Sequence, residues 1–324
     1  MRAVVFNEPG EPSVLHIENR GKPVPGDNEV LIKVAAAGVN RPDTFQRLGR
    51  YPAPKGIVQD IPGLEISGTI EKAGSKVTTW KEGQSVFALV AGGGYAEYVV
   101  ADAGSCLPVP KGFSLEDAAA LPEVLFTVWH NLFQRGGLKK GEDVLIYGGS
   151  GGIGAMAIQL TNLFGAHAYS MASSEGKMNY CLDLGAKKVV NYKEKKLPDE
   201  LGTESMDLIL DSLGGEYLDT NLDLLRPDGR LVYINAMEGG RPPFDIKKMM
   251  RKRLHITGST LRARDYEFKK ALAEDIYRNA FPLLEDKRFK NMVKSRFPLE
   301  MAADAHRLME SRDFVGKIIL LTGE

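Results

Sequence analysis

Hydrophobic and polar positions alternate along residues 1 to about 110, with the period of two that is typical of strands. Glycine and proline separate the alternating segments, as they do at turns between strands. The pattern therefore predicts an antiparallel, partly barrel-like β region. The clearest predicted strands cover residues 29–39, 68–74, 83–90 and 95–102.

Near residues 114–133 the period becomes helical, with Ser114 as the expected N-cap. From there predicted strands and helices alternate, which indicates a parallel sheet with right-handed crossovers. The strands are expected at 143–147, 167–172, 188–192, 206–214, 229–236 and 254–261, and the helices at 154–165, 175–186 and 217–225. Helices near 265–285 and 299–311 and a strand at 316–323 complete the chain.

The composition gives no general attraction to polyanions, because 42 lysines and arginines balance 42 aspartates and glutamates. The start of the chain lacks the apolar core of a signal peptide, and no apolar run approaches the length of a bilayer span. Two cysteines, Cys106 and Cys181, are too few for a disulfide framework. We expect a soluble, cytoplasmic protein that binds neither membrane nor nucleic acid. The basic run 247–253 has no interleaved aromatics, and we interpret it as the solvated face of a helix that buries Met249 and Met250.

A glycine-rich loop lies between the strand at 143–147 and the helix that follows it. Gly149, Gly151 and Gly154 have the G-x-G-x-x-G spacing of a dinucleotide-binding loop, in the strand-to-helix context that this motif needs. The glycines would form a tight turn, admit the pyrophosphate and allow the helix to pack closely. Gly152 and Ile153 complete the expected cofactor loop. The alternative is a tight turn that binds no ligand.

The end of the second strand in this region favours NADPH over NADH. An NAD site usually carries an acid there, but the run 172–174 is Ala-Ser-Ser, and Ser173 leaves room for a 2′-phosphate. Lys177 offers a positive charge, and Tyr192 offers a ring for adenine or a hydroxyl for the phosphate. Glu175 would repel a phosphate unless it lies at the exposed start of its helix. Lys177 also has the alternative of an ordinary solvated lysine.

The segments at 35–52 and 61–86, followed by the glycine loop, resemble the medium-chain dehydrogenase/reductase superfamily. Within it, the chain is most similar to the zinc-independent quinone oxidoreductases, the zeta-crystallin-like branch. The resemblance implies an α/β fold with a GroES-like, partly barrel-shaped β substrate domain and a Rossmann doubly wound parallel sheet. The substrate domain would comprise residues 1–122 and 262–324, and the NADPH-binding domain residues 123–261, with cofactor and substrate in a cleft between them.

No metal site is expected. The zinc-binding relatives use a cysteine and a histidine at positions that correspond here to Asn40 and Leu64. Two cysteines cannot form a four-cysteine zinc site, and the five histidines show no ligand spacing. Glu65, next to Leu64, is expected to pair with a nearby base or to line the pocket.

The resemblance also implies the residues of the active site. Tyr51, Asn40 and Thr127 would line the nicotinamide end as catalytic residues, with Leu261 and Lys317 nearby. Further positions that match cofactor-lining residues are Ser150, Ala236 and Met237. From the residues alone, Asn40 is equally an ordinary turn residue, and Tyr51 is equally a packed aromatic in an extended loop.

These expectations lead to a zinc-independent, NADPH-dependent quinone oxidoreductase that transfers hydride to a small-molecule quinone. One alternative is an NADPH-dependent reductase of 2-enoyl thioesters or other activated alkenes, because both reactions place hydride on a conjugated acceptor. Another is a non-catalytic NADPH-binding protein, like the crystallin or RNA-binding relatives. The strand at 254–261 is expected at a sheet edge that pairs with its copy, giving a homodimer or a tetramer.

Overall fold

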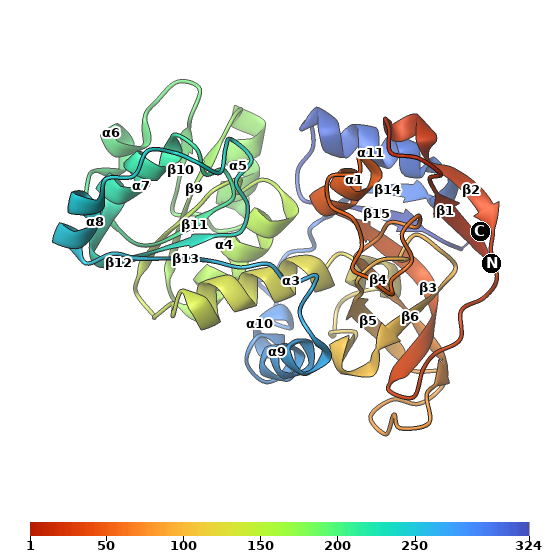
Figure 1. Cartoon of the computed structure of the whole chain (residues 1–324). Coiled ribbons are helices and arrows are strands. Elements are labelled where there is room, and N and C mark those ends of the chain that lie inside the picture. The colour runs from red at the N-terminus through yellow and green to blue at the C-terminus, as the bar shows by residue number, and fades with distance from the viewer. Residues whose placement is uncertain (324) are drawn as a thin grey trace. The chain divides into compact units, whose positions relative to one another are not determined.

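The structure, a computed structural model, describes residues 1–323 and divides into two compact units (Figure 1). Unit 1 comprises Met1–Phe126, Arg262–Glu285 and the residues from Asn291 onward. Unit 2 comprises Thr127–Leu261 and Asp286–Lys290. The chain thus enters unit 2 at Thr127, returns to unit 1 at Arg262 and enters unit 2 again for the short segment Asp286–Lys290.

Unit 1 is built on a seven-stranded sheet in the order β14-β15-β3-β4-β5-β7, in which β6 pairs with β3. Every pair is antiparallel except β14 with β15. This confirms the antiparallel β region that the alternating pattern predicts. The strands are β3 (Glu29–Val39), β4 (Glu65–Ala73), β5 (Ser85–Leu89), β6 (Tyr98–Asp102), β7 (Cys106–Pro108), β14 (Val293–Pro298) and β15 (Lys317–Leu321), beside a separate ribbon of β1 (Arg2–Val5) and β2 (His16–Asn19).

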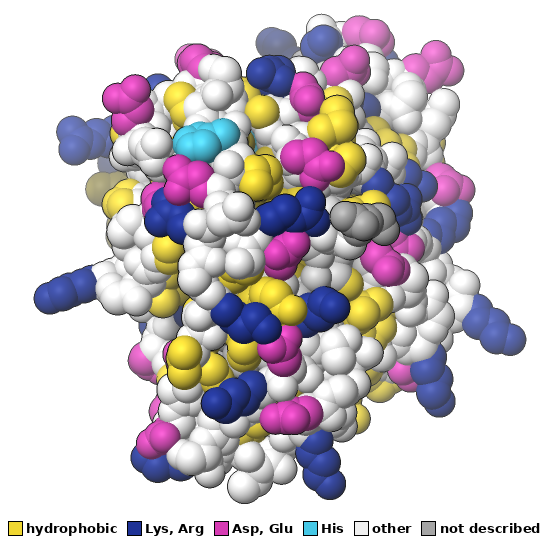
Figure 2. Space-filling model, turned by 90° about the vertical axis from the view of Figure 1, so that its right-hand side faces the viewer, with side chains coloured by type: hydrophobic (Ala, Val, Ile, Leu, Met, Phe, Trp, Pro, Cys, Tyr) yellow, Lys and Arg dark blue, Asp and Glu magenta, His cyan; other side chains and the backbone are white. Residues whose placement is uncertain are grey.

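The helices of unit 1 are short, apart from two near the end of the chain. Apolar side chains of β1, β3, β4, β5 and α11 form one continuous core. The helices are α1 (Arg41–Arg47), α2 (Leu115–Ala118), α9 (Tyr266–Asn279), α10 (Phe281–Leu284) and α11 (Ala302–Ser311), with 3₁₀ turns η1 (Pro12–Val14), η2 (Ala103–Ser105) and η4 (Leu299–Met301). In Figure 2, lysine and arginine side chains are interspersed with aspartate and glutamate, in keeping with the balanced charge.

Unit 2 is a six-stranded, fully parallel sheet in the order β10-β9-β8-β11-β12-β13. Successive strands are added toward one edge from β8 to β10 and toward the other edge from β11 to β13, so the topological switch point lies between β8 and β11. Open α/β sheets bind ligands at such a point, outside the carboxyl ends of the strands. The strands are β8 (Asp143–Ile146), β9 (His167–Ala172), β10 (Lys188–Asn191), β11 (Met206–Asp211), β12 (Leu225–Tyr233) and β13 (His255–Gly258). The helices are α4 (Gly152–Phe164), α5 (Glu175–Asp183), α6 (Leu197–Leu201), α7 (Tyr217–Leu224) and α8 (Ile246–Lys252). The parallel sheet and the edge position of β13 are as predicted.

The helical region predicted at 114–133 is confirmed, but it is interrupted. Ser114 caps α2 by accepting a hydrogen bond from the Asp117 N–H at 3.0 Å, as expected. The helix α3 (Pro122–Val128) begins at a proline, whose fixed φ suits a first helical position. It continues as a π-helical segment, η3 (Trp129–Arg135).

The basic run at 247–253 forms a helix and Met249 packs against the core, as predicted. Met250 and Lys252 differ from the prediction, because Met250 is 65% exposed and Lys252 is buried. The Lys252 ammonium donates to the carbonyls of Leu222, Asp223 and Leu225 at 2.8–3.0 Å. These backbone oxygens at the end of α7 replace its hydration, so one residue of the run is structural instead of solvated.

Candidate active site

The glycine loop of unit 2 joins β8 to α4, and two of the three glycines of the motif are required for steric reasons. A Cβ at Gly149 would lie 2.1 Å from Ser170 Oγ on the neighbouring strand. A Cβ at Gly154 would lie 2.3 Å from the carbonyl oxygen of Gly148. Gly148 has a φ of +69° and accepts a hydrogen bond from the Gly151 N–H at 3.1 Å. The tight turn and the close packing of the helix therefore both require glycine.

Gly151 is different, because a Cβ there would meet nothing closer than the Gly148 carbonyl oxygen at 3.6 Å. It is the N-cap of α4, which has no side-chain cap and no acidic residue in its first turn. Ser150 precedes it, and Gly152 and Ile153 form the first turn of the helix. An uncapped helix N-terminus next to open space fits an anionic ligand such as a pyrophosphate.

The residues predicted to select NADPH lie at the carboxyl ends of β9 and β10. Ser173 follows β9 directly, and Lys177 is in the first turns of α5. The Tyr192 N–H donates to the Ala172 carbonyl at 3.2 Å, which brings Tyr192 beside the end of β9. Its side chain is 43% exposed. Glu175 is the exposed first residue of α5, the position in which it compensates the helix dipole.

An acid that sequence reasoning missed organises the loop after β11. Asp211 is fully buried and accepts hydrogen bonds from the N–H groups of Leu213 at 2.6 Å and Gly214 at 3.0 Å. Asn221 Nδ2 donates to its other oxygen at 2.8 Å. Burial raises the pKa of Asp211, while these three donors favour its charged form. An acid that ends an apolar strand before Gly-Gly is the signal for such a turn.

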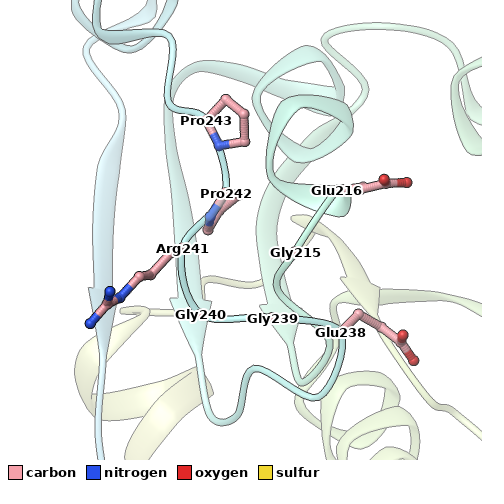
Figure 3. Close-up of a pocket in the computed structure, with 8 residues that line it drawn as sticks. All are labelled: Gly215, Glu216, Glu238, Gly239, Gly240, Arg241, Pro242 and Pro243. Carbon is pink, nitrogen blue, oxygen red and sulfur yellow. The ribbon is translucent and has the colours of Figure 1, made fainter.

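The loop after β12, which carries the predicted residues Ala236 and Met237, is tied to this turn. The Met237 N–H donates to the Ser212 carbonyl at 3.3 Å, and the Gly215 N–H donates to the Gly239 carbonyl at 2.8 Å. The two loops wall an open hollow of about 650 Å³. In Figure 3 the side chains of Glu216 and Glu238 point to one side and that of Arg241 points to the other. The backbone of the two loops therefore forms much of the wall. The lining residues are Gly215, Glu216, Glu238, Gly239, Gly240, Arg241, Pro242 and Pro243.

In unit 1 a buried polar cluster forms where three strands meet, and it consists of Asn40, Glu65 and Lys317. The register pairs Ile318 with Val39, so Lys317 at the start of β15 lies beside Asn40 at the end of β3. Lys317 Nζ donates to Asn40 Oδ1 at 2.6 Å and forms an ion pair with Glu65. Asn40 Nδ2 donates to the same Glu65 oxygen at 2.8 Å. The expected pairing of Glu65 with a base is thus confirmed, and its partner is Lys317.

This cluster fixes the Asn40 amide, because its oxygen faces a cation and its nitrogen faces a carboxylate. The second Glu65 oxygen accepts from the Glu123 N–H at 2.8 Å. Asn40, Glu65 and Lys317 are all less than a tenth exposed. A Cβ at Gly38 would lie 2.0 Å from Glu65 Oε1, so the buried carboxylate requires glycine on the adjacent strand. The Asn40 amide nitrogen carries a second N–H that can donate to a further acceptor.

The other predicted catalytic residues are distributed between the units. Tyr51 follows α1 in unit 1, is half-buried, and burial raises the pKa of its hydroxyl. Thr127 is buried in unit 2, where its carbonyl accepts from Asn131 Nδ2 at 2.8 Å. Ser259 Oγ donates to Asn131 Oδ1 at 2.8 Å, which places Thr127 near the segment that ends in Leu261. The convergence of all these residues on one nicotinamide stays a prediction.

Within residues 1–323, histidine, cysteine, aspartate and glutamate nowhere form a group of three or more that could hold a metal ion. Cys106 and Cys181 are both buried and unpaired with each other. Burial raises the pKa of both thiols, that of Cys181 to about 12. Both are therefore inert as nucleophiles at neutral pH. In the same range, the helices are too short or too polar to span a membrane.

Comparison with known proteins gives full-length similarity. Residues 26–111 match the alcohol dehydrogenase GroES-like domain, and residues 152–275 match the zinc-binding dehydrogenase family. Among curated proteins, a quinone oxidoreductase of Sus scrofa is 33% identical, covering 99% of this chain and 98% of the relative. A 2-methylene-furan-3-one reductase of Solanum lycopersicum is 27% identical, covering 99% and 79%.

Solved structures give the same result. An NAD-dependent alcohol dehydrogenase superposes with a TM-score of 0.88 at 29% identity, covering 100% of both chains. The Escherichia coli quinone oxidoreductase complexed with NADPH superposes with a TM-score of 0.87 at 27% identity, covering 99% of this chain and 100% of that one. The expected fold, a GroES-like β domain with a Rossmann sheet, is confirmed.

Proposed function

Because this chain belongs to the quinone oxidoreductase branch of the medium-chain dehydrogenase/reductase superfamily, we propose that it transfers hydride from NADPH to a quinone without a metal ion. The observation that carries the proposal is full-length similarity to quinone oxidoreductases together with a complete glycine loop. In the proposed reaction the quinone takes up one hydride and one proton and leaves as the hydroquinone.

The choice of NADPH rests on the carboxyl end of β9. Ser173 stands where an NAD site usually has an acid, and Lys177 and Tyr192 supply a cation and a hydroxyl for a 2′-phosphate. The E. coli relative is complexed with NADPH, whereas another structural relative is NAD-dependent. Because the relatives differ in their cofactor, the proposal of NADPH over NADH rests on Ser173, Lys177 and Tyr192 of this chain.

The bound cofactor supplies the hydride, and the protein supplies position and hydrogen bonds. We assign the remaining Asn40 N–H and the Tyr51 hydroxyl to the substrate or the nicotinamide ribose. Thr127, Leu261 and Lys317 complete the proposed nicotinamide environment. Lys317 acts through Asn40, because its ammonium is buried against Asn40 and Glu65.

The proposal of a metal-free reaction rests on the buried cluster. Asn40 and Leu64 offer no ligand where the zinc-binding relatives have a cysteine and a histidine. The nearby carboxylate of Glu65 is engaged by Lys317, Asn40 and the Glu123 N–H. A cation that pairs with this carboxylate disfavours a second cation beside it.

The test is NADPH oxidation by the purified protein with 1,4-benzoquinone and 9,10-phenanthrenequinone, before and after treatment with a chelator. Turnover that survives the chelator, in protein without stoichiometric zinc by elemental analysis, is the expected result. Chelator-sensitive turnover would contradict the metal-free proposal. NADPH binding without quinone turnover would leave a reductase of other acceptors or a non-catalytic NADPH-binding protein.

A second candidate is an NADPH-dependent reductase of activated alkenes or 2-enoyl thioesters. The full-length similarity to a 2-methylene-furan-3-one reductase favours it. Crotonyl-CoA and a simple α,β-unsaturated ketone in the same assay separate the candidates. Preference for these acceptors over both quinones would replace the quinone proposal.

We further propose a homodimer formed through β13, or a tetramer built from two such dimers. This strand is the edge of the parallel sheet and pairs only with β12 within the described chain. An open edge presents unpaired N–H and C=O groups with which a strand of another chain can pair.

A further inference from the structure

Arg262 is the first residue of unit 1 after the chain returns from unit 2, and its side chain is buried. Its guanidinium donates to three separate segments of that unit. Nε donates to the Ala91 carbonyl at 2.8 Å, in the loop after β5. Nη2 donates to Gln46 Oε1 at 2.5 Å, on α1. Nη1 donates to the Tyr51 carbonyl at 3.0 Å.

The same guanidinium also lies over the Tyr51 side chain. Its central carbon is 5.1 Å from the centre of the Tyr51 ring, within the range of a cation–π interaction. Tyr51 is thus held by its backbone carbonyl and by the face of its ring. The charged side chains that act on the Tyr51 hydroxyl are Arg262 and Glu123.

We propose that Arg262 is the positioning residue for Tyr51, fixing the ring against one face so that the hydroxyl presents a single orientation to the substrate. This inference rests on the proposed function, in which Tyr51 contacts the substrate. Arginine suits the role because its planar fork reaches three acceptors at once. The three segments that Arg262 joins are the end of α1, the loop that contains Tyr51 and the loop that contains Ala91. The Arg262 side chain therefore helps to set the distances between them.

Lysine at this position would keep the charge but could not donate to all three acceptors in the same geometry. Glutamine would remove the cation from the ring and keep part of the hydrogen bonding. Gln46 has a second partner, since its Nε2 donates to the Gln59 carbonyl at 2.9 Å. The end of α1 therefore stays anchored when Arg262 is replaced.

The first experiment compares Arg262→Gln and Arg262→Lys with Arg264→Gln as the matched control. Arg264 is two residues away, exposed, and stacks on Phe268 instead of Tyr51. For Arg262→Gln we expect kcat/KM for phenanthrenequinone to fall about tenfold or more, with the Kd for NADPH unchanged within about twofold. Arg262→Lys should recover part of the loss, and Arg264→Gln should resemble the wild type.

The fall must also depend on Tyr51. In a Tyr51→Ala background, Arg262→Gln should lower kcat/KM by less than about twofold, because residues that act through one another are not additive. An equal loss in both backgrounds would overturn the inference. Thermal unfolding of each variant identifies any that lose the fold, in which case Arg262→Lys carries the same comparison.

A second readout does not depend on turnover. The protein is labelled with 3-fluorotyrosine, and the ¹⁹F signal of residue 51 is assigned by its loss in Tyr51→Phe. The signal should titrate at higher pH in Arg262→Gln than in the wild type, because the cation favours the tyrosinate. An unchanged titration contradicts the inference. Absence of quinone turnover in the wild type contradicts the proposed function alone.

Discussion

The ion pair between Glu65 and Lys317 shows, for single residues, how a charge is kept in the interior. Each charged group has its opposite charge and at least one further hydrogen-bond partner, among them Asn40 and the Glu123 N–H. Such a pair contributes little net stability when complete, but either member alone is a buried charge without compensation.

We therefore predict that Lys317→Met destabilises the protein by about 3–5 kcal/mol in urea unfolding. Glu65→Gln in the same chain should recover part of this loss, because it removes the unpaired carboxylate. If the free energy of unfolding of Lys317→Met lies within about 1 kcal/mol of the wild-type value, the cluster is hydrated and the prediction is wrong.

A second buried network in unit 1 contains two groups with opposite pH dependence. Asp43 accepts from the N–H groups of Asn40 at 2.8 Å and Gly63 at 3.2 Å and from the Tyr95 hydroxyl at 3.1 Å. The Tyr95 hydroxyl lies 3.2 Å from His306 Nε2. Burial raises the pKa of Asp43 to about 6, and burial with the Arg47 charge lowers the pKa of His306 to about 3.

The signs of the two contributions follow from these directions. The raised pKa of Asp43 gives stability that is present below pH 3.8 and lost as pH rises through about 6. The lowered pKa of His306 gives stability that is present above pH 6.5 and lost as pH falls toward about 3. On acidification from pH 6.5 to about 4, Asp43→Asn should lose more stability than the wild type and His306→Gln should lose less. Unfolding by urea at each pH measures both, and shifts in the same direction would contradict the assignment.

The proposed 2′-phosphate site depends on Lys177. We predict that Lys177→Ala weakens NADPH binding about tenfold and NADH binding by less than about twofold, because only NADPH carries the additional phosphate. Lys247→Ala, which removes an exposed lysine from α8, is the control. Isothermal titration with both nucleotides is the measurement, and equal losses for both would move the phosphate elsewhere.

Among the elements, the loop between β8 and α4 contains one glycine that we expect to matter for NADPH binding and another that we expect to matter for stability. Gly151→Ala should leave the unfolding temperature within about 2 °C of the wild type, because the nearest atom to its Cβ is 3.6 Å away. It should weaken NADPH binding about tenfold or more, since the added methyl group would occupy the space proposed for the pyrophosphate. Gly154→Ala should instead destabilise the fold, because its Cβ would lie 2.3 Å from the Gly148 carbonyl oxygen. Normal NADPH binding by Gly151→Ala would place the phosphates away from this loop.

Sequence periodicity predicted the long, regular elements and missed contacts that depend on tertiary context. Strands β3 and β8 and helix α4 follow from local pattern alone, because each presents a continuous apolar face or run. The burial of Lys252 did not follow, because its acceptors are carbonyls at the end of another helix. Asp211 and Arg262 were also missed. A single buried acid or arginine has no periodicity, and the partners of Arg262 also lie far away in the sequence.

For the whole molecule, the open edge of β13 carries the prediction of assembly. Sedimentation should give twice the chain mass of 35.5 kDa, or four times for a tetramer. Amides of β13 should lose protection from hydrogen exchange on dilution, whereas those of β10, at the opposite edge of the same sheet, should not change. A monomer at all concentrations would contradict the proposed dimer.

The position of β15 in its sheet has a consequence for biosynthesis. This strand, nearly the last of the chain, lies between β14 and β3, and Arg2 Nη2 donates to the Thr322 carbonyl at 3.2 Å. The sheet of unit 1 therefore stays incomplete until β15 has been synthesised, and all the strands of unit 2 precede β15 in the chain. A nascent chain would carry a finished parallel sheet together with a long apolar strand, β3, that waits for its partner. A chaperone that shields such a strand would therefore act on the first segment of unit 1 until β15 is available to pair with β3.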